Sequence, residues 1–239
     1  MSEPIVQKRM VAFLDIQGFK NFLETNGTEN TYAFYKKEIY SKILGFREYS
    51  AYMNGTDIQI SKIGDIIGFY WFSDSIILYS KKDQDDYLYT VLSIAAHLLE
   101  SINSSTPIWL RCGVSYGEMS ADPDGILIGA ALIEAYKLEE SQNWFGGALT
   151  NSAADKVEEM AKTNRDSYNQ LVTNYPIPMK TKCFNPRYAL NWPRDVLPNR
   201  KMPPPDSADP RVQIKYENTM AFYREVKGNR TKYDPRYQN

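Results

Sequence analysis

The chain has 239 residues, of which 43% are apolar and 24% charged, enough for one large domain or for one domain with a substantial appendage. Its formal net charge of -1 gives no bulk attraction to nucleic acid or to an anionic membrane, so we predict neither as a partner. Cys112 and Cys183 have no disulfide or metal-ligand spacing, and no leader segment or bilayer-spanning apolar run is found, which predicts a cytoplasmic protein.

The first predicted element is a short apolar strand at 11–14, which delivers one carboxylate, Asp15, before a helical pattern begins. A carboxylate at the end of a buried strand is costly unless a cation, backbone N–H groups or a metal ion pairs with it. Just after it, Gly18 permits close approach of a phosphate, and the helix N-terminus offers free N–H groups. The stretch 11–19 therefore predicts a metal–nucleotide site. The alternative is that Asp15 only caps the helix.

Hydrophobic periodicity and turn residues predict the remaining elements. Ser73-Asp74-Ser75 forms the tip of a predicted hairpin, and Gly64-Asp65 marks an earlier turn. In chain order we expect a helix over 20–52 with a break near Asn26-Gly27, strands at 58–63, 66–72 and 76–80, a helix over 87–102, a strand over 108–119, a helix within 125–140, a strand at 148–150, a helix to 161, strands at 175–180 and 187–192, and a helix over 212–226.

This order of elements favours one fold class. Helices alternate with strands, but a hairpin interrupts the alternation, which is typical of an α+β sandwich of the split βαβ type (ferredoxin-like or palm). From residue 193 the composition changes and prolines crowd together. We therefore expect a domain over 1–192 and, over 193–239, a proline-rich segment with a terminal helix that packs on the domain or extends from it.

The position of Asp74 becomes informative beside that of Asp15. In a split βαβ sheet the first strand lies next to the hairpin, so the two carboxylates face each other across adjacent strands. Such a pair can hold two divalent cations for in-line displacement at phosphorus, and its hard oxygen ligands suit Mg²⁺ or Mn²⁺. The alternative is that Asp74 serves only the turn, because Ser-Asp-Ser is ordinary turn chemistry.

Five stretches resemble, in the right order, the motifs of one enzyme family. VAFLDIQGF and WFSDSIIL resemble the two metal-binding segments of the class III nucleotidyl cyclases, the adenylate and guanylate cyclase family. LRCGVSYGEM resembles the R-x-G-x-x-x-G strand of that family, with Arg111, Gly113 and Gly117 matching. GAALIEAYKLE resembles its G-x-x-V-N-x-A-x-R-L-E helix, and PMKTK followed by RYALNW resembles its K-G-K hairpin. The resemblance covers residues 11–192.

This resemblance implies a cyclase fold, a nucleoside triphosphate substrate and a head-to-tail homodimer with active sites at the interface. It implies that Asp15, Asp74 and the carbonyl of Ile16 hold two Mg²⁺ or Mn²⁺ ions. Lys180 falls on the lysine that contacts the triphosphate, with a solvated hairpin lysine as the alternative. The turn formed by residues 16–19 (Ile16, Gln17, Gly18 and Phe19) is expected to bind the substrate, with its N–H groups facing phosphate.

The chain departs from the family at three positions. Four residues before the second metal aspartate, purine cyclases carry a base-reading lysine, whereas this chain has Tyr70. Tyrosine offers a ring face and one hydroxyl in place of the lysine ammonium, or it simply packs across strands. Ile133 replaces the asparagine of the helix, and Lys137 replaces the transition-state arginine, keeping the charge but losing the bidentate fork. We assign Lys137 to catalysis and Tyr70 to the base.

Together these departures resemble the compact bacterial pyrimidine cyclases of the Pycsar anti-phage type. The function implied is conversion of UTP or CTP, with UTP favoured, to the 3′,5′-cyclic nucleotide and pyrophosphate. A purine nucleotide cyclase and a degenerate cyclase-fold module that binds nucleotide without turnover are the alternatives. A third is another palm-type phosphoryl transferase, although the glycine-rich signature usual beside the hairpin acid is missing from SDSII.

Overall fold

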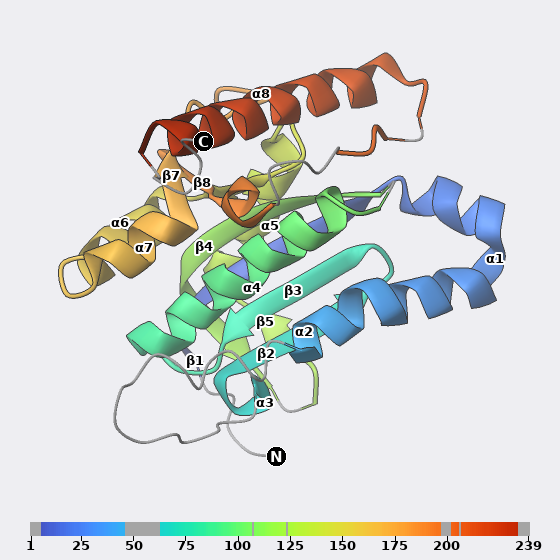
Figure 1. Ribbon diagram of the computed structural model, residues 1–239. Coiled ribbons are helices and arrows are strands. Elements are labelled where there is room, and N and C mark those ends of the chain that lie inside the picture. The colour runs from blue at the N-terminus through green and yellow to red at the C-terminus, as the bar shows by residue number, and fades with distance from the viewer. Residues whose placement is uncertain are drawn as a thin grey trace.

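The structure is a computed structural model that describes residues 6–45, 63–106, 108–122, 124–196, 202–205 and 207–233 (Figure 1). The elements in chain order are β1 (Val6–Gln17), α1 (Phe19–Tyr35), the π-helical turn η1 (Lys36–Tyr40), α2 (Ser41–Gly45), α3 (Ile63–Ile66), β2 (Ile67–Phe72), β3 (Ser75–Ser80), α4 (Asp85–Asn103), β4 (Trp109–Ala121), β5 (Leu127–Ile128), α5 (Ala130–Ser141), β6 (Gly147–Leu149), α6 (Asn151–Met160), α7 (Arg165–Leu171), β7 (Val172–Asn174), β8 (Tyr188–Leu190), the 3₁₀ turn η4 (Trp192–Asp195) and α8 (Pro210–Tyr233).

The strands of the described residues form one sheet with the order β2-β3-β1-β4-β6-β8-β7, and β5 pairs with β4. β1 lies between β3 and β4 and is antiparallel to both. The order β2-β3-β1-β4, with α1 and α4 as the connecting helices, is that of the split βαβ fold. The predicted fold class is therefore confirmed, and β1 lies beside the hairpin as expected.

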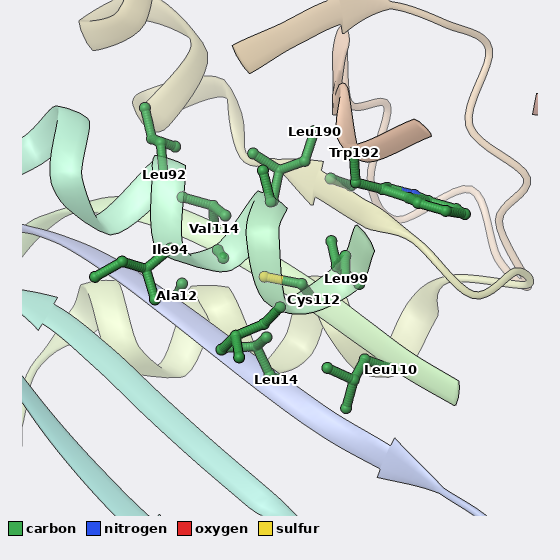
Figure 2. Packing of buried hydrophobic residues seen from close by; sticks show 14 of the residues in the cluster. Ala12, Leu14, Leu92, Ile94, Leu99, Leu110, Cys112, Val114, Leu190 and Trp192 are labelled. Atoms are coloured by element: carbon green, nitrogen blue, oxygen red, sulfur yellow. The ribbon is translucent and has the colours of Figure 1, made fainter. Parts of the chain in front are cut away.

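Alternation along β1 divides the core between the two faces of the sheet. Ala12 and Leu14 point into the larger core, which α4 covers, and Val11 and Phe13 point toward α5 on the other face. Figure 1 shows α4 in front of the sheet and α5 behind it. Figure 2 shows Ala12 and Leu14 packed with side chains of α4 and β4. The residue that follows in this alternation on the α5 side is Asp15.

Gly113 explains how α5 can lie so close to β4. A Cβ atom built on Gly113 would lie 2.1 Å from the carbonyl oxygen of Ala135, a distance that no side chain could tolerate. The first glycine of the R-x-G-x-x-x-G motif is thus required because a helix backbone rests on it. This contact fixes α5, and with it Glu139, against the end of β4.

The terminal helix packs into the same core as the sheet. Phe222 of α8 is fully buried, and its ring lies 4.9 Å from that of Trp144 and 4.6 Å from that of Tyr175. The prediction of this helix over 212–226 is confirmed, and the helix runs on to Tyr233. Figure 1 shows α8 lying along one edge of the molecule, above β8 and η4.

Three sequence predictions of local structure need correction. The stretch 175–180 is no strand: β7 ends at Asn174, and only Met179 makes an isolated bridge, to Gln142. Prolines at 176 and 178 remove the N–H donors that a ladder needs. Helix α7 was not predicted, and Gly64-Asp65 lies in the short helix α3. The end of the first predicted helix and the strand at 58–63 fall mostly outside the described residues.

The break in the first helix is confirmed, because Gly27 interrupts α1 with non-helical backbone angles. Among the described residues, no helix is long and apolar enough to cross a membrane.

Candidate active site

The hairpin brings Asp74 to the end of β1 that carries Asp15. Asp15 pairs in register with Ser75, the first residue of β3. The backbone N–H of Ile16 donates to the carbonyl oxygen of Asp74 at 2.9 Å, which ties the hairpin tip to β1. Ser73, with a φ of 55°, supplies the left-handed backbone that a two-residue hairpin tip requires. Asp15, near the end of β1, and Asp74, at the hairpin tip, therefore lie at the same end of the sheet.

The turn after β1 has the geometry predicted for an anion site. Gly18 has a φ of 82°, a conformation that other residues rarely adopt, and it forms the N-cap of α1. Phe19 is the first helical residue, so the first N–H groups of α1 lie directly beyond the glycine. Asp15 lies within β1 and makes no capping bond. The alternative in which it serves only as the N-cap is wrong.

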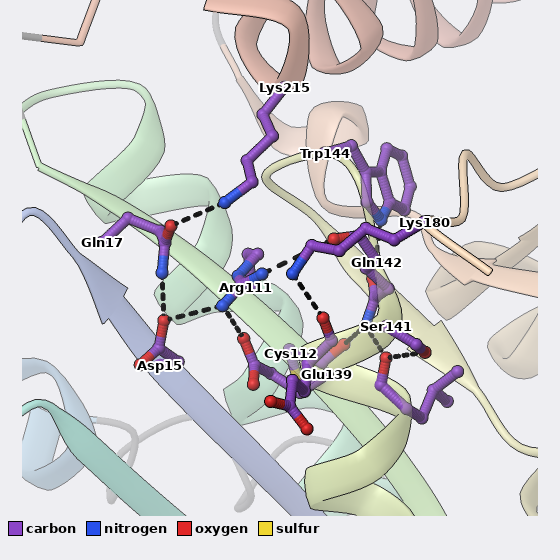
Figure 3. A network of polar contacts seen from close by, with 12 residues as sticks. Asp15, Gln17, Arg111, Cys112, Glu139, Ser141, Gln142, Trp144, Lys180 and Lys215 are labelled. Carbon is purple, nitrogen blue, oxygen red and sulfur yellow. Dashed lines mark hydrogen bonds and ion pairs between the residues drawn. The ribbon is translucent and has the colours of Figure 1, made fainter. Parts of the chain in front are cut away.

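Asp15 belongs to a buried polar network that links β1, β4 and α5 (Figure 3). Arg111 of β4 places Nη2 3.1 Å from Asp15 Oδ2 and 2.6 Å from Glu139 Oε1. Gln17 also donates to Asp15 Oδ2. Only 8% of the Arg111 side chain, 18% of that of Asp15 and 3% of that of Glu139 are exposed. One guanidinium therefore forms ion pairs with two carboxylates that have little access to water.

Burial leaves Glu139 a weaker acid than usual. Its pKa is raised to about 7, because loss of hydration and the charge of Asp15 outweigh the attraction of Arg111. The contact between Arg111 and Glu139 is an ion pair without hydrogen-bond geometry, and both Arg111 Nε and Glu139 Oε1 lack a hydrogen-bond partner among the described residues. This part of the network is held by charge and packing.

Two lysines complete the network from distant parts of the chain. Lys180 Nζ donates to the carbonyl oxygen of Glu140 at 2.5 Å, and Lys215 Nζ of α8 donates to Gln17 Oε1 at 3.0 Å. Burial and the charge of Arg111 lower the pKa of Lys180. Burial, followed by the charges of Arg111 and Lys180, lowers the pKa of Lys215 to about 8. We call Asp15, Gln17, Arg111, Glu139, Lys180 and Lys215 the polar network.

The donor set at the turns fits magnesium or manganese. Across the described residues, no group of three or more His, Cys, Asp or Glu side chains could hold a metal ion by itself. Mg²⁺ does not need such a cage, because it keeps several waters and uses one or two carboxylates together with substrate phosphates. Both protein contacts of Asp15 use Oδ2, so Oδ1 is the oxygen best placed for a cation. Asp74 and the carbonyl of Ile16 would add oxygen ligands.

Tyr70 and Lys137 lie apart from the polar network within one chain. Tyr70 pairs with Ile77, which also pairs with Phe13, so Tyr70 lies on the same face of the sheet as Asp15. It is 44% exposed on the edge strand β2. Lys137 is exposed on α5, one turn beyond the exposed Ile133.

The exposed surface around Tyr70 and Ile133 carries several large apolar side chains. Phe72 is 69% exposed on the same face of β2 as Tyr70, and Tyr136 of α5 packs edge-on against Phe13 at 5.3 Å. We call this surface the open face and define it by Tyr70, Phe72, Ile133 and Tyr136, each at least 44% exposed.

No protein-family model matches the chain, and no curated protein matches its sequence. Solved structures match it in fold. The guanylyl cyclase domain of the RhoGC fusion protein from the aquatic fungus Blastocladiella emersonii, in a monomeric form, has a TM-score of 0.51 and 12% identity over 79% of this chain and 98% of that one. A dimeric form of that domain gives 0.50 and 12% over 80% and 98%. A bacterial light-regulated adenylyl cyclase gives 0.50 and 14% over 95% and 57%.

The chain has the fold of the class III cyclases. The fold implied by the five motifs is thus confirmed, while the roles of the individual residues remain predictions. Tyr35 is a neighbour that the motifs missed. Its hydroxyl is buried without a hydrogen-bond partner among the described residues, and burial, then Asp74 and Asp15, raise its pKa. The charges of both aspartates thus act on this tyrosine of α1.

A cavity of about 610 Å³ between α1, η1 and β2 adjoins the two turns through Phe19 and Ser73. Its walls are mostly apolar and aromatic, including Leu23, Tyr35 and Trp71. A triphosphate needs cations and N–H donors, so the polar network suits it better than this cavity does.

Sequence reasoning also missed the partners of Asp15. Arg111 and Glu139 stood in the motifs, but nothing in their spacing indicated that they would pair with each other and with Asp15. The signal that could have found them is the register of the split βαβ sheet, which sets Arg111 opposite Asp15. Lys215 lies about 200 residues from Gln17, and no sequence pattern connects them.

Proposed function

We propose that the protein is a class III-type nucleotide cyclase that converts a nucleoside triphosphate to its 3′,5′-cyclic monophosphate and pyrophosphate. The observation that carries the proposal is the pair of turns at the end of β1. The Ile16–Asp74 hydrogen bond holds Asp74 beside Asp15, and the left-handed Gly18 opens the N-terminus of α1 next to them. Carboxylates for cations and N–H donors for phosphate thus meet in one place, on a fold that cyclases share.

In this reaction the ribose 3′-oxygen forms a bond to the α-phosphorus, and the bond from the α-phosphorus to the bridging oxygen breaks. Pyrophosphate leaves with the bonding electrons, and the hydroxyl proton passes to solvent. Two divalent cations held by Asp15, Asp74 and the Ile16 carbonyl would supply charge neutralisation and a more acidic 3′-hydroxyl. The α1 N-terminus and Lys180 orient the phosphates, and their positive charge stabilises the leaving group.

We further propose that the active form is a homodimer in which each chain completes the site of the other. Lys137 is exposed on α5, whereas Glu139, two residues on, is buried in the network. This exposure supports a role for Lys137 at the site of a second chain. The open face around Tyr70 and Tyr136 offers the exposed apolar surface that such an interface would bury.

The substrates that we propose are UTP and CTP, with UTP preferred, for a role in anti-phage signalling like that of the pyrimidine cyclases that the sequence resembles. The support is Tyr70, which lies on the same face of the sheet as Asp15. It occupies the sequence position at which purine cyclases carry a lysine. A tyrosine ring there would leave less room for a two-ring base than for a pyrimidine, and its hydroxyl can bond a pyrimidine edge. ATP and GTP are the alternatives, because the solved structures of similar fold are named as adenylyl and guanylyl cyclases.

A second candidate is a module that binds nucleotides without turnover. The observation that favours it is the pairing of Asp15 Oδ2 with both Arg111 and Gln17, which competes with a cation for the carboxylate. The replacement of the family's asparagine by Ile133 and of its arginine by Lys137 also favours a module without turnover.

One experiment separates these candidates. Purified protein is incubated with each of the four ribonucleoside triphosphates and either Mg²⁺ or Mn²⁺, and the products are identified by mass. We expect cyclic UMP first and cyclic CMP second. Binding of nucleotide with no cyclic product under any condition would favour the module, and faster formation of cyclic AMP or cyclic GMP would favour a purine cyclase.

A further inference from the structure

Helix α8 brings a cation to the candidate site from outside the stretch 11–192 that resembles the cyclases. Lys215 Nζ donates to Gln17 Oε1 at 3.0 Å, and Gln17 in turn donates to Asp15 Oδ2 (Figure 3). Lys215 therefore lies two hydrogen bonds away from a proposed metal ligand. It also lies beside Gln17, the residue that precedes Gly18 at the N-terminus of α1, where a phosphate would bind in the proposed site.

The turn of α8 that follows Lys215 is fixed in place by bonds to the core. Asn218 Nδ2 donates to the carbonyl oxygen of Asn143 at 2.7 Å, and Thr219 Oγ1 accepts from the backbone N–H of Phe145 at 2.7 Å. Tyr216 packs edge-on against Trp109, with ring centroids 5.4 Å apart. These contacts hold the backbone that presents Lys215, so its position at the site is built into the fold.

The charges around Lys215 favour an anion. Arg111 and Lys180 lie close enough to lower its pKa, while Asp15 and Glu139 raise it by less. Three cations thus lie around two carboxylates, and one of these carboxylates, that of Asp15, is the proposed metal ligand. A lysine ammonium has three donors, and Gln17 uses one of them. The remaining donors and the surplus positive charge suit the oxygens of a polyphosphate.

We propose that Lys215 binds the triphosphate of the substrate, so that α8 forms part of the active site. The identity of the ligand as a nucleoside triphosphate rests on the proposed function, whereas the polyphosphate chemistry rests on the network. Lys215 then supplies from its own chain a charge two hydrogen bonds away from Asp15.

The test measures binding of inorganic tripolyphosphate with Mg²⁺ by calorimetry, because this probe has neither base nor ribose and undergoes no cyclisation. Lys215→Ala should weaken binding by about 10- to 100-fold, the range for a lost hydrogen bond to a charged group. Lys215→Arg should retain most of the affinity. Arg224→Ala removes the same charge from an exposed position on the same helix and should bind like the wild type.

The outcomes separate this inference from the cyclase proposal. If Lys215→Ala and Lys215→Gln both fold and bind tripolyphosphate as the wild type does, or if the wild type does not bind it, the inference is overturned even where cyclic nucleotide is formed. If the wild type makes no cyclic nucleotide but the alanine variant loses polyphosphate affinity that arginine restores, the cyclase proposal fails and the inference stands. In an active enzyme, Lys215→Ala should also raise KM for every triphosphate alike.

Discussion

The polar network and the open face lie on the same side of the sheet. Most side chains of the network are paired with one another in the interior, whereas those of the open face are exposed to solvent. In the network, β1, β4, α5 and α8 of a single chain meet, Arg111 forms ion pairs with both carboxylates, and Lys215 is held by a hydrogen bond to Gln17. On the open face, Tyr70 and Phe72 stand on an edge strand that α5 does not cover, and they remain largely exposed.

This difference indicates which part of the proposed site a single chain can form by itself and which part would require a second chain. Buried charges are tolerated only with partners, so the network had to be finished within the fold. Exposed aromatic groups persist without strain, but clustered together they favour burial against a second surface. In the proposed dimer, one chain would supply the metal and phosphate chemistry and its partner would supply Lys137, while the open face with Tyr70 would lie at the interface.

The strongest test of the network side replaces the two aspartates. Asp15→Asn or Asp74→Asn should each lower cyclic nucleotide formation by about 1,000-fold or more, about 4 kcal/mol in activation free energy, because an amide cannot replace a carboxylate at a divalent cation. Product is measured by mass, and a thermal melt establishes that each variant folds. Turnover within tenfold of the wild type in both variants would remove the two-metal mechanism.

Arg111→Met tests whether the network is a closed structural unit. The variant leaves Glu139 and Asp15 buried without their cation, and we expect a loss of about 3–5 kcal/mol in the free energy of unfolding at pH 8. The folded-state pKa of Glu139, about 7, lies above its ordinary value, so its stability contribution is present at low pH and is lost as the pH rises through 7. The defect should therefore be smaller at pH 5.

Urea unfolding at both pH values measures the effect, and Glu139→Gln in the same chain should recover part of it. An unchanged stability at pH 8 would mean that Arg111 does not hold the two carboxylates.

The proposal that each active site uses residues of two chains can be tested by mixing two inactive variants. Asp15→Asn and Lys137→Ala should each be inactive alone, but a heterodimer would contain one intact site. With equal amounts and free exchange of subunits, about one quarter of the wild-type activity should return, since half of the dimers are mixed and half of their sites are intact. No recovery, with exchange established by mass spectrometry, would place the whole site within one chain.

A smaller effect is expected at the base. Tyr70→Ala should lower the preference for UTP over ATP by about tenfold or more, because a wrong base then leaves fewer buried groups unpaired. The ratio of kcat/KM for the two substrates measures the change. Phe69→Ala, on the same strand and also partly exposed, is the control and should keep the wild-type ratio. Equal ratios in the two variants would return Tyr70 to a packing role.

The smallest expected effect concerns stability at Lys215. Its folded-state pKa of about 8 lies below the ordinary 10.5, so the charged form destabilises the fold at pH 7, and this cost fades as the pH rises toward 10.5. Lys215→Met should therefore raise the free energy of unfolding by about 1 kcal/mol at pH 7 and by less at pH 10. A loss of stability at pH 7 would show that the lysine is held for structure rather than for an anion.

The sequence alone predicted the features that depend on neighbouring residues. Apolar runs with turn residues between them predicted β1, the hairpin and α4, and the order of these elements predicted the split βαβ sheet. That sheet places the strand of Asp15 beside the hairpin of Asp74, and Gly18 marks the left-handed turn. Each of these follows from a local pattern or from the few ways in which such elements can pack.

Only the tertiary structure decided which side chains meet across long separations. It paired Arg111 with Asp15 and Glu139, and it brought Lys215 of α8 to Gln17, because strand register and helix packing set these distances and no sequence period encodes them. It also turned Lys137 outward while burying Glu139 two residues away. A helix places such neighbours on different sides, and only contact with β4 determines which side is buried.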